Sequence, residues 1–245
     1  MKLLVVGDSC EDVFVYGECD RLAPAAPVPV FVEKNRKTNK GMAGNVYRNL
    51  IALGADCDIL TNRNEITKTR YVEAKTNHMI MRIDSGEEKI KKVNNLHLVE
   101  FEKYNAVVIS DYDKGFLSHE DIRFIASRHE LVFLDSKKLL GDWVKEVSFI
   151  KINEVEYEKT KHLIEGSEWW RDKLIVTASS RGCIYQEKTY TVQNVEVKDL
   201  SGAGDTFLAG LVFNYVKNRN ICDSIVFANT CATHVVQQRG VTTIK

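Results

Sequence analysis

The sequence lacks the features that place a protein in a membrane or on a nucleic acid. No apolar run approaches the roughly 18 residues that a membrane span needs, and the run that follows Met1 and Lys2 is too short for a signal peptide. Lysine plus arginine balances aspartate plus glutamate, with 34 of each kind, so no excess charge points to a nucleic acid or an anionic membrane. We therefore expect a cytoplasmic protein whose partner is a small molecule.

Several common site motifs are also absent. The six cysteines are scattered, with no Cys-x-x-Cys pair and no histidine spacing typical of zinc, so we expect reduced thiols. No Gly-x-x-x-x-Gly-Lys-Ser/Thr segment occurs, which excludes a P-loop. A dinucleotide fingerprint needs glycine at the position of Phe207 and normally follows the first strand, so a Rossmann oxidoreductase is the most distant function considered.

The sequence does contain an alternation of strands and helices. At 245 residues the chain is long enough for one large α/β domain. Toward the end we expect a helix over 228–236 and a short strand from Gly240. Short apolar runs end in polar residues, as parallel strands do where their carboxyl ends meet a ligand; these runs are 3–6, 106–110, 131–134, 148–152 and 174–177.

Two further pairs of segments alternate in the manner of short strands. They are 13–17 with 28–32, and 69–74 with 78–83. The three prolines of the chain lie in or beside the first pair, and proline within a strand is typical of a sheet edge or of an excursion from the main sheet. We therefore expect a small β-sheet lid formed by two segments, about 13–34 and 68–86.

The stretch 197–207 carries the strongest chemical pattern. Gly202, Ala203 and Gly204 leave the backbone uncovered just before apolar residues at helical spacing. Unpaired amides and the positive end of the helix dipole favour an anion there. Asp205 would then take a proton from a hydroxyl while the amides hold the phosphoryl group that the hydroxyl attacks. The same residues are also typical of a tight turn before an acidic first helical turn, so the motif alone leaves both interpretations open.

Polar residues after the first strand and at the start of a helix are further candidates. Asp8 and Asp12 suit hydrogen bonds to sugar hydroxyls, and equally a turn cap or a solvated loop. Gly41 and Asn45 suit a close approach of a ligand to a helix start, and equally helix packing with a capping asparagine; this helix is expected to end at Gly54.

Two lysines and one pair of polar residues are candidates for phosphate chemistry. Lys114 and Lys138 lie just past the ends of strands, where an anionic substrate would bind, and we expect Lys138 to be a solvated surface residue. Asn153 and Glu156 have the spacing of a capping box. Beside a phosphate site, Glu156 would also suit Mg²⁺ and its waters.

Taken together, these motifs resemble the ribokinase-like (PfkB) carbohydrate kinases, and in most detail their heptose 7-phosphate kinase branch. The matching segments occur in the order of that family: 6–8 with Asp12, 16–30, 41–46 with 52–55, 82–84, 110–115, Asn153 with Glu156, 176–177 with Gly182, and 200–206. The Arg-Leu-Ala-Pro-Ala-Ala-Pro-Val-Pro-Val run within 16–30 is the segment most specific to the branch.

The resemblance implies a ribokinase-like α/β fold over a single domain, 1–245, with a mainly parallel central sheet flanked by helices and covered by the lid. In relatives the lid often mediates a homodimer. The implied reaction transfers the γ-phosphoryl group of ATP to the anomeric hydroxyl of a heptose 7-phosphate, giving the 1,7-bisphosphate. The alternatives are a PfkB-type kinase for another sugar or sugar phosphate and a non-catalytic regulator that binds sugar or nucleotide.

The resemblance also assigns roles to residues at matching positions. Asp205 would be the catalytic base, and the amides of Gly202, Ala203 and Gly204 the anion hole. Sugar contacts fall to Asp12, Gly41 and Asn45, and the substrate's own phosphate to Lys114. ATP contacts fall to Asn153, Glu156, Thr177, Gly182 and Asn229, with Mg²⁺ held by Glu156 through water.

Two departures from the family pattern bear on the sugar pocket and on the edge of the sheet. Met42 stands where the family usually has glycine, which would reshape the sugar pocket. Relatives insert about one β-α unit within the passage 60–69, whereas here we expect the chain to run almost directly from a strand into the lid. A shortened sheet edge is therefore expected.

Overall fold

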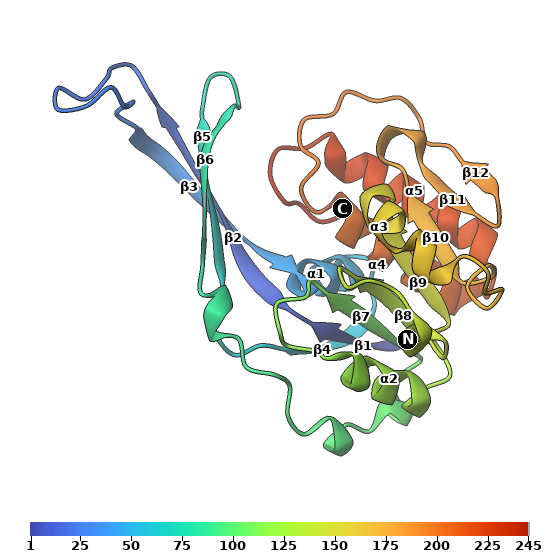
Figure 1. Cartoon of the computed structure of the whole chain (residues 1–245). Helices are drawn as coiled ribbons and strands as arrows, with labels where there is room; N and C mark the ends of the chain where they lie inside the picture. The colour runs from blue at the N-terminus through green and yellow to red at the C-terminus, as the bar shows by residue number, and fades with distance from the viewer. Residues whose placement is uncertain (245) are drawn as a thin grey trace.

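The computed structural model describes residues 1–244; Lys245, the last residue of the expected domain, lies outside this range. Its centre is an eight-stranded sheet in the order β12-β11-β10-β9-β8-β7-β1-β4 (Figure 1). Six strands run parallel to one another: β1, β4, β7, β8, β9 and β10. The last two, β11 and β12, form an antiparallel hairpin at one edge. The strands are β1 (Lys2–Gly7), β4 (Asp56–Thr61), β7 (Ala106–Asp111), β8 (Val132–Ser136), β9 (Phe149–Asn153), β10 (Leu174–Thr177), β11 (Cys183–Tyr185) and β12 (Lys188–Tyr190).

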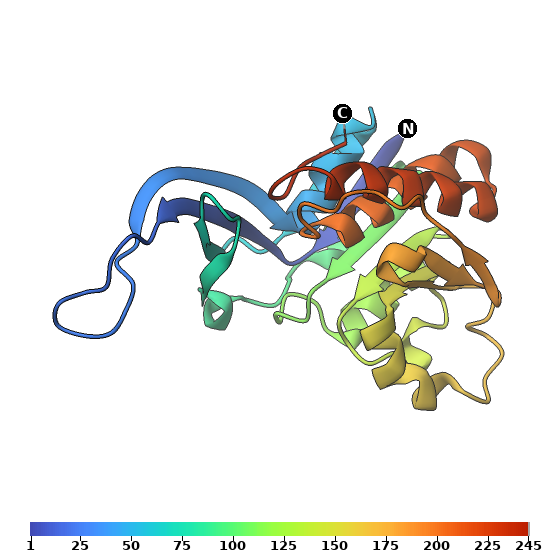
Figure 2. The same ribbon diagram turned by 90° about the horizontal axis from the view of Figure 1, so that it is seen from above.

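Helices cover both faces of this sheet (Figure 2). Leu3 and Val5 of β1 belong to the apolar cluster that includes α1, α4 and α5, whereas Leu4 and Val6 belong to the cluster that includes α2. Because both faces of the sheet are buried, its strands appear in the sequence as continuous apolar runs. The expected α/β fold with a mainly parallel central sheet flanked by helices is confirmed. The helices are α1 (Ala43–Ala52), α2 (His119–Arg128), α3 (Glu154–Ile164), α4 (Ala203–Asn218) and α5 (Ile221–Val236), with short 3₁₀ turns at η1 (Glu87–Lys89), η2 (Leu96–Leu98), η3 (Phe101–Lys103), η4 (Asp142–Val144) and η5 (Ser179–Arg181).

A second, smaller sheet projects from the body and forms the lid (Figure 1). Its order is β3-β2-β5-β6, built from β2 (Ser9–Glu18), β3 (Val32–Met42), β5 (Thr67–Glu73) and β6 (Met79–Ser85). The expected strand over 28–32 is wrong except at Val32, where β3 begins. Residues 28–31 lie in the loop at the tip of the lid, where an isolated bridge joins Leu22 and Pro29. Proline cannot donate to a strand ladder, so continuous pairing with β2 starts only after the last proline.

The root of the lid follows directly from the sheet. β1 passes into β2 with only Asp8 between them, and β4 passes into β5 through residues 62–66. Asn62 links these two connections. Its side-chain oxygen accepts from the Ser9 backbone nitrogen at 2.7 Å, and its side-chain nitrogen donates to the Ser9 carbonyl at 3.1 Å. The expected short connection after β4 is thus confirmed, and β4 is the edge strand of the main sheet.

The C-terminal expectations need correction. Helix α5 begins at Ile221 rather than at residue 228, because the Asn220 side chain caps the amides of Cys222 and Asp223. No strand forms over 237–244; the Gly240 amide instead donates to the Asp199 carboxylate at 3.0 Å. Within residues 1–244, no helix is long and apolar enough to cross a membrane.

Replacing Leu208 should test the layer formed by α4. Leu208 is fully buried between the sheet and the neighbouring helices, so Leu208→Ala should lower the free energy of unfolding by about 2–5 kcal/mol. Leu98 is 69% exposed, and Leu98→Ala as the matched control should change it by less than about 0.5 kcal/mol. Urea denaturation of both variants gives the comparison, and equal losses would contradict the packing described here.

Candidate active site

The N-terminus of α4 contains the glycine motif expected to bind an anion. Gly202 is the N-cap, with φ of 81°. A Cβ atom at this position would lie 2.6 Å from the Nδ2 atom of Asn45, so the turn requires glycine for both conformation and space. Asp199 holds the preceding loop, because its carboxylate accepts from the amides of Ser201 at 2.8 Å and Gly240 at 3.0 Å.

The amides of this turn are only partly available for a ligand. Within residues 1–244, the amides of Gly202 and Gly204 donate to no protein acceptor, whereas the Ala203 amide donates to the Leu200 carbonyl at 3.3 Å. The expectation that all three amides are free is therefore wrong for Ala203, because the chain closes a tight turn before the helix. The Gly202 and Gly204 amides still point to an anion site.

Asp205 lies in the first turn of α4 and is 4% exposed. The Tyr112 hydroxyl donates to its Oδ1 atom at 2.6 Å, and the Asn45 amide donates to its Oδ2 atom at 3.0 Å. Burial raises the pKa of Asp205 to about 6, although the hydrogen bonds from Tyr112 and Asn45 act in the opposite direction. A carboxyl group that titrates close to neutrality is suited to general-base chemistry.

A buried ion pair lies beside this turn. The Lys151 ammonium contacts the Asp135 carboxylate at 2.7 Å, and each side chain is 3% exposed. A methyl group at Gly204 would lie 2.9 Å from the Lys151 nitrogen, so this cation borders the anion site. Burial acts to raise the pKa of Asp135, but Lys151 and Lys137 outweigh it and the pKa is lowered.

Tyr112, Asp135 and Lys151 are site residues that the sequence motifs did not predict. A lysine inside the otherwise apolar strand β9 was the available signal for Lys151, since a buried ammonium needs a partner. Tyr112 carried no such signal, because its role depends on where the loop after β7 meets α4.

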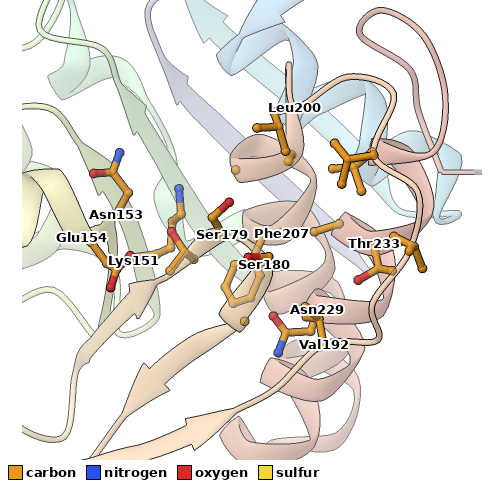
Figure 3. Close-up of a pocket in the computed structure, with 18 of the residues that line it drawn as sticks. Lys151, Asn153, Glu154, Ser179, Ser180, Val192, Leu200, Phe207, Asn229 and Thr233 are labelled. Atoms are coloured by element: carbon orange, nitrogen blue, oxygen red, sulfur yellow. The ribbon is translucent and has the colours of Figure 1, made fainter.

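A cavity of about 480 Å³ opens between the ends of β9 and β10, the N-terminus of α4 and helix α5 (Figure 3). Four of the five residues assigned to ATP line it: Asn153, Thr177, Gly182 and Asn229. Ala203 and Gly204 also line the cavity, which places it next to the anion site. Figure 3 shows apolar side chains on the α4 and α5 side, among them Leu200, Phe207 and Val192, opposite the polar Lys151 and Asn153.

Glu156 does not line this cavity but a neighbouring one of about 150 Å³, which Asn153 and Lys137 border as well. The expected capping box is confirmed, since Glu156 donates its amide to the Asn153 side chain and accepts from the Asn153 amide, each at 2.9 Å. Lys137 contacts the remaining side of the carboxylate at 2.5 Å. Both oxygens of Glu156 therefore already have protein donors.

On the lid side, three of the expected sugar contacts converge. Asp12 is 6% exposed, and a Cβ atom at Gly41 would lie 2.1 Å from its Oδ2 atom, so any larger residue at position 41 would displace the Asp12 side chain. Asn45 reaches Asp205 from the opposite side of the same region. Arg70 contacts Asp12 at 2.5 Å. Met42, which precedes α1, has a φ of 56°, a conformation that is strained for a side chain of this size.

Lys114, the fourth residue expected to contact the substrate, lies at the root of the lid. Its ammonium contacts Glu87 at 2.6 Å, and the same carboxylate contacts the buried Lys68 at 2.6 Å. The expectation of a solvated Lys138 is wrong: its side chain is 10% exposed and contacts both oxygens of the fully buried Asp111 at 2.8 Å. A buried carboxylate requires a cation, which outweighs the solvation of the lysine.

The raised pKa of Asp205 predicts a pH-dependent stability. The pKa of Asp205 is about 6 in the folded state, whereas its ordinary value is 3.8. The protonated carboxyl group therefore stabilises the fold fully below pH 3.8, and this contribution is lost as the pH rises through 6. From about pH 4 to pH 8, the free energy of unfolding of the wild type should therefore fall relative to that of Asp205→Asn by about 2 kcal/mol. Urea denaturation across this range measures the difference, and a constant difference would contradict the assignment.

Comparison with solved structures places the fold. A Methanocaldococcus jannaschii nucleoside kinase, described as an archaeal member of the ribokinase family, superposes with a TM-score of 0.71 at 19% identity, covering 98% of this chain and 93% of that one. An Arabidopsis thaliana ribokinase complexed with ribose and ATP superposes with a TM-score of 0.68 at 15% identity, covering 97% and 93%. The architecture is therefore ribokinase-like.

Comparison with sequences extends this result. The Bifunctional protein HldE of a Nitratiruptor species is 32% identical over 292 positions, which cover 99% of this chain and 63% of that protein. Because 292 positions exceed the 245 residues of this chain, the relative carries residues inside the aligned region that this chain lacks. Residues 58–245 match the model of the pfkB family carbohydrate kinases. The ribokinase-like fold and this match over most of the sequence show that the chain belongs to the pfkB family of carbohydrate kinases.

Proposed function

We propose that this protein is an ATP-dependent sugar-phosphate kinase that phosphorylates the anomeric hydroxyl of a heptose 7-phosphate, giving the 1,7-bisphosphate. The observation that carries the proposal is the position of Asp205. Its carboxylate and the free amides of Gly202 and Gly204 belong to one helical turn. This turn borders the 480 Å³ cavity through Ala203 and Gly204, and it contacts Asn45 of the expected sugar-binding region through Asp205.

The proposed reaction needs few groups. Asp205 accepts the proton of the sugar hydroxyl as the hydroxyl oxygen attacks the γ-phosphorus, and the bond from phosphorus to the bridging oxygen of ADP breaks. The amides of Gly202 and Gly204, with the nearby Lys151 ammonium, stabilise the charge on the transferring group. Positioning and charge neutralisation supply most of the catalysis in such a transfer.

The 480 Å³ cavity supports ATP as the phosphoryl donor. Its apolar wall, with Leu200, Phe207 and Val192, suits a nucleobase and ribose, and its polar end at Lys151 and Asn153 suits phosphates (Figure 3). Gly204, the residue before Asp205, lines the cavity, so a phosphate bound beside Gly204 would lie near Asp205.

Magnesium fits this site only together with water and phosphate. Within residues 1–244, no group of three or more histidine, cysteine, aspartate or glutamate side chains is arranged to hold a metal ion. Both oxygens of Glu156 accept hydrogen bonds from protein groups. They therefore suit hydrogen bonds to water molecules bound to the metal better than direct coordination of the metal. Glu156 and Asn153 would hold Mg²⁺ in this manner, and the ion would neutralise charge on the phosphates of ATP.

A cluster at the root of the lid supports a phosphorylated substrate. It consists of Lys68, Arg70, Arg82 and Lys114 with three carboxylates, Asp12, Asp84 and Glu87. The Lys68 side chain is only 8% exposed, and it contacts Glu87 at 2.6 Å and Asp84 at 3.1 Å. Such a concentration of cations beside the sugar-binding region fits a phosphate on the acceptor better than a neutral sugar. The heptose itself rests on the resemblance to the heptose 7-phosphate kinase branch.

A homodimer through the lid is part of the proposal. The edge strand β6 exposes Met79, Met81 and Ile83 by 51%, 50% and 42%. A second copy covering this strand would remove these side chains from water.

ADP release across a panel of heptose, hexose and pentose phosphates tests the proposed function. We expect the highest kcat/KM with a heptose 7-phosphate. Highest kcat/KM with another sugar phosphate would identify a different kinase of the same family. Binding of sugar phosphate and ATP without any ADP release would identify a non-catalytic regulator instead.

Asp205→Asn should lower turnover by a factor on the order of 10² to 10⁴ because the variant has no base for the hydroxyl proton. ATP binding should stay close to that of the wild type. Asp223 is an exposed aspartate in the first turn of α5, so Asp223→Asn is the matched control and should retain full turnover. Near-normal turnover by Asp205→Asn would exclude the proposed base.

Lys68→Met should raise KM for the sugar phosphate about 10- to 100-fold, because a hydrogen bond to a charged group contributes about 1.5–3 kcal/mol. KM for ATP should not change. Lys75 is a lid lysine with a 64% exposed side chain, so Lys75→Met serves as the control. If Lys68→Met folds, as measured by circular dichroism, and keeps the wild-type KM for the sugar phosphate, the cluster does not bind the acceptor's phosphate.

A further inference from the structure

Tyr112 contacts the carboxylate assigned as the base but has no role in the reaction described above. It follows β7 directly, and its hydroxyl lies 2.6 Å from Oδ1 of Asp205. Tyr112 also lines the 480 Å³ cavity, and its ring packs against the cluster of Cys10, Met42 and Ile66 on the lid side. Its side chain therefore stands between the nucleotide cavity and the sugar-binding region.

The main chain of Tyr112 is held by buried carboxylates. Its amide donates to Oδ2 of Asp8 at 2.7 Å, and Asp8 is fully buried and also accepts from the Phe116 amide at 3.4 Å. On the other side, Asp111 is fully buried and fixed by Lys138 and Ser136. These contacts give the buried Asp8 and Asp111 a structural purpose, and they set the position from which the phenol reaches Asp205.

The two oxygens of Asp205 have donors from different parts of the fold. Tyr112, from the loop after β7, binds Oδ1, and Asn45, from α1, binds Oδ2. Asn45 is fixed in turn, since its Oδ1 atom accepts from the Asn49 amide at 3.1 Å. A carboxylate held at both oxygens cannot rotate about its Cβ–Cγ bond without breaking one of these hydrogen bonds.

We propose that Tyr112 is a positioning residue of this kinase, whose phenol fixes the plane of the Asp205 carboxylate so that a lone pair of the base faces the acceptor hydroxyl. The inference rests on the proposed function for its kinetic consequence. The phenol acts through Asp205 and takes no part in proton transfer. When the carboxylate is already held in the productive orientation, it does not have to rotate into place before the proton is transferred.

The charges around Asp205 agree with this role. Burial and the carboxylates of Asp205 and Asp135 hold the pKa of Tyr112 well above its usual value, so the phenol remains a hydrogen-bond donor. The groups that face Asp205 come from five elements or loops: Asp135 in β8, Lys151 in β9, Lys137 after β8, Asn45 in α1 and the Cys10 thiol in β2. Among the hydrogen bonds to Asp205, that of Tyr112 contributes most to lowering its pKa.

Tyr112→Phe removes the hydroxyl and keeps the ring that packs on Cys10, Met42 and Ile66. The ¹³C carboxyl signal of Asp205, assigned by its loss in Asp205→Asn, should titrate about one unit higher in Tyr112→Phe than in the wild type. kcat should fall at every pH, and its acidic limb should move upward by the same interval, with KM for ATP unchanged. An Asp205 titration that does not move, or an unchanged kcat, would overturn the proposal.

Tyr104→Phe is the matched control. The Tyr104 hydroxyl also donates to an aspartate, Asp58 of β4, at 2.9 Å, but this contact is exposed, so its loss should leave the Asp205 titration and kcat unchanged. The titration needs no substrate and therefore separates two failures. Absence of turnover in the wild type would refute the proposed function, whereas an unshifted Asp205 signal in Tyr112→Phe would refute the positioning role.

Discussion

The organisation of this protein depends on one buried carboxylate at the start of a helix. Asp205 has lost its water, which is costly for an ionised group. Its compensation comes from the N-terminal turn of α4, from the Tyr112 and Asn45 donors, and from the Lys151 cation nearby. Burial acts against these contacts and prevails, which leaves the carboxyl group with a pKa of about 6.

The topology explains how these groups meet. The loop after β7 and the ends of β8 and β9 lie at one edge of the sheet, so Tyr112, Asp135 and Lys151 approach the N-terminus of α4 from neighbouring strands. Helix α1 packs beside α4 and adds Asn45 from the other side. The lid rises from the same edge through β2 and β5, which follow the carboxyl ends of β1 and β4. In open α/β sheets, ligands bind at this edge for the same geometric reason.

Local patterns predicted the parts of the fold and the site that depend on local structure. The turn at Gly202 and the capping box of Asn153 with Glu156 are short-range features, and both are present as expected. The buried strands could be recognised in the sequence because helices cover both faces of the sheet, which makes each strand a continuous apolar run. The strand β3 was placed wrongly because most of its residues are exposed and polar, which removes the apolar alternation that reveals a strand.

Residues that act across the fold were beyond local patterns. Tyr112 and Asp135 become site residues only through the register of β7, β8 and β9. Lys138 looked solvated because its partner, Asp111, comes from a different strand. The Ala203 amide is an exception, because the turn that uses it is local and closes on Leu200; the sequence motif itself left a tight turn open.

The position of Glu87 has a consequence for how tightly a substrate can be held. Its carboxylate lies between the Lys68 and Lys114 ammonium groups as an intramolecular counterion. An entering phosphate must compete with this tethered anion, whose effective concentration is far above that of any free metabolite. In the proposed reaction, this competition weakens the binding of the acceptor's own phosphate. The proposed bisphosphate product would then leave more readily, because Glu87 returns to the two ammonium groups as the product departs.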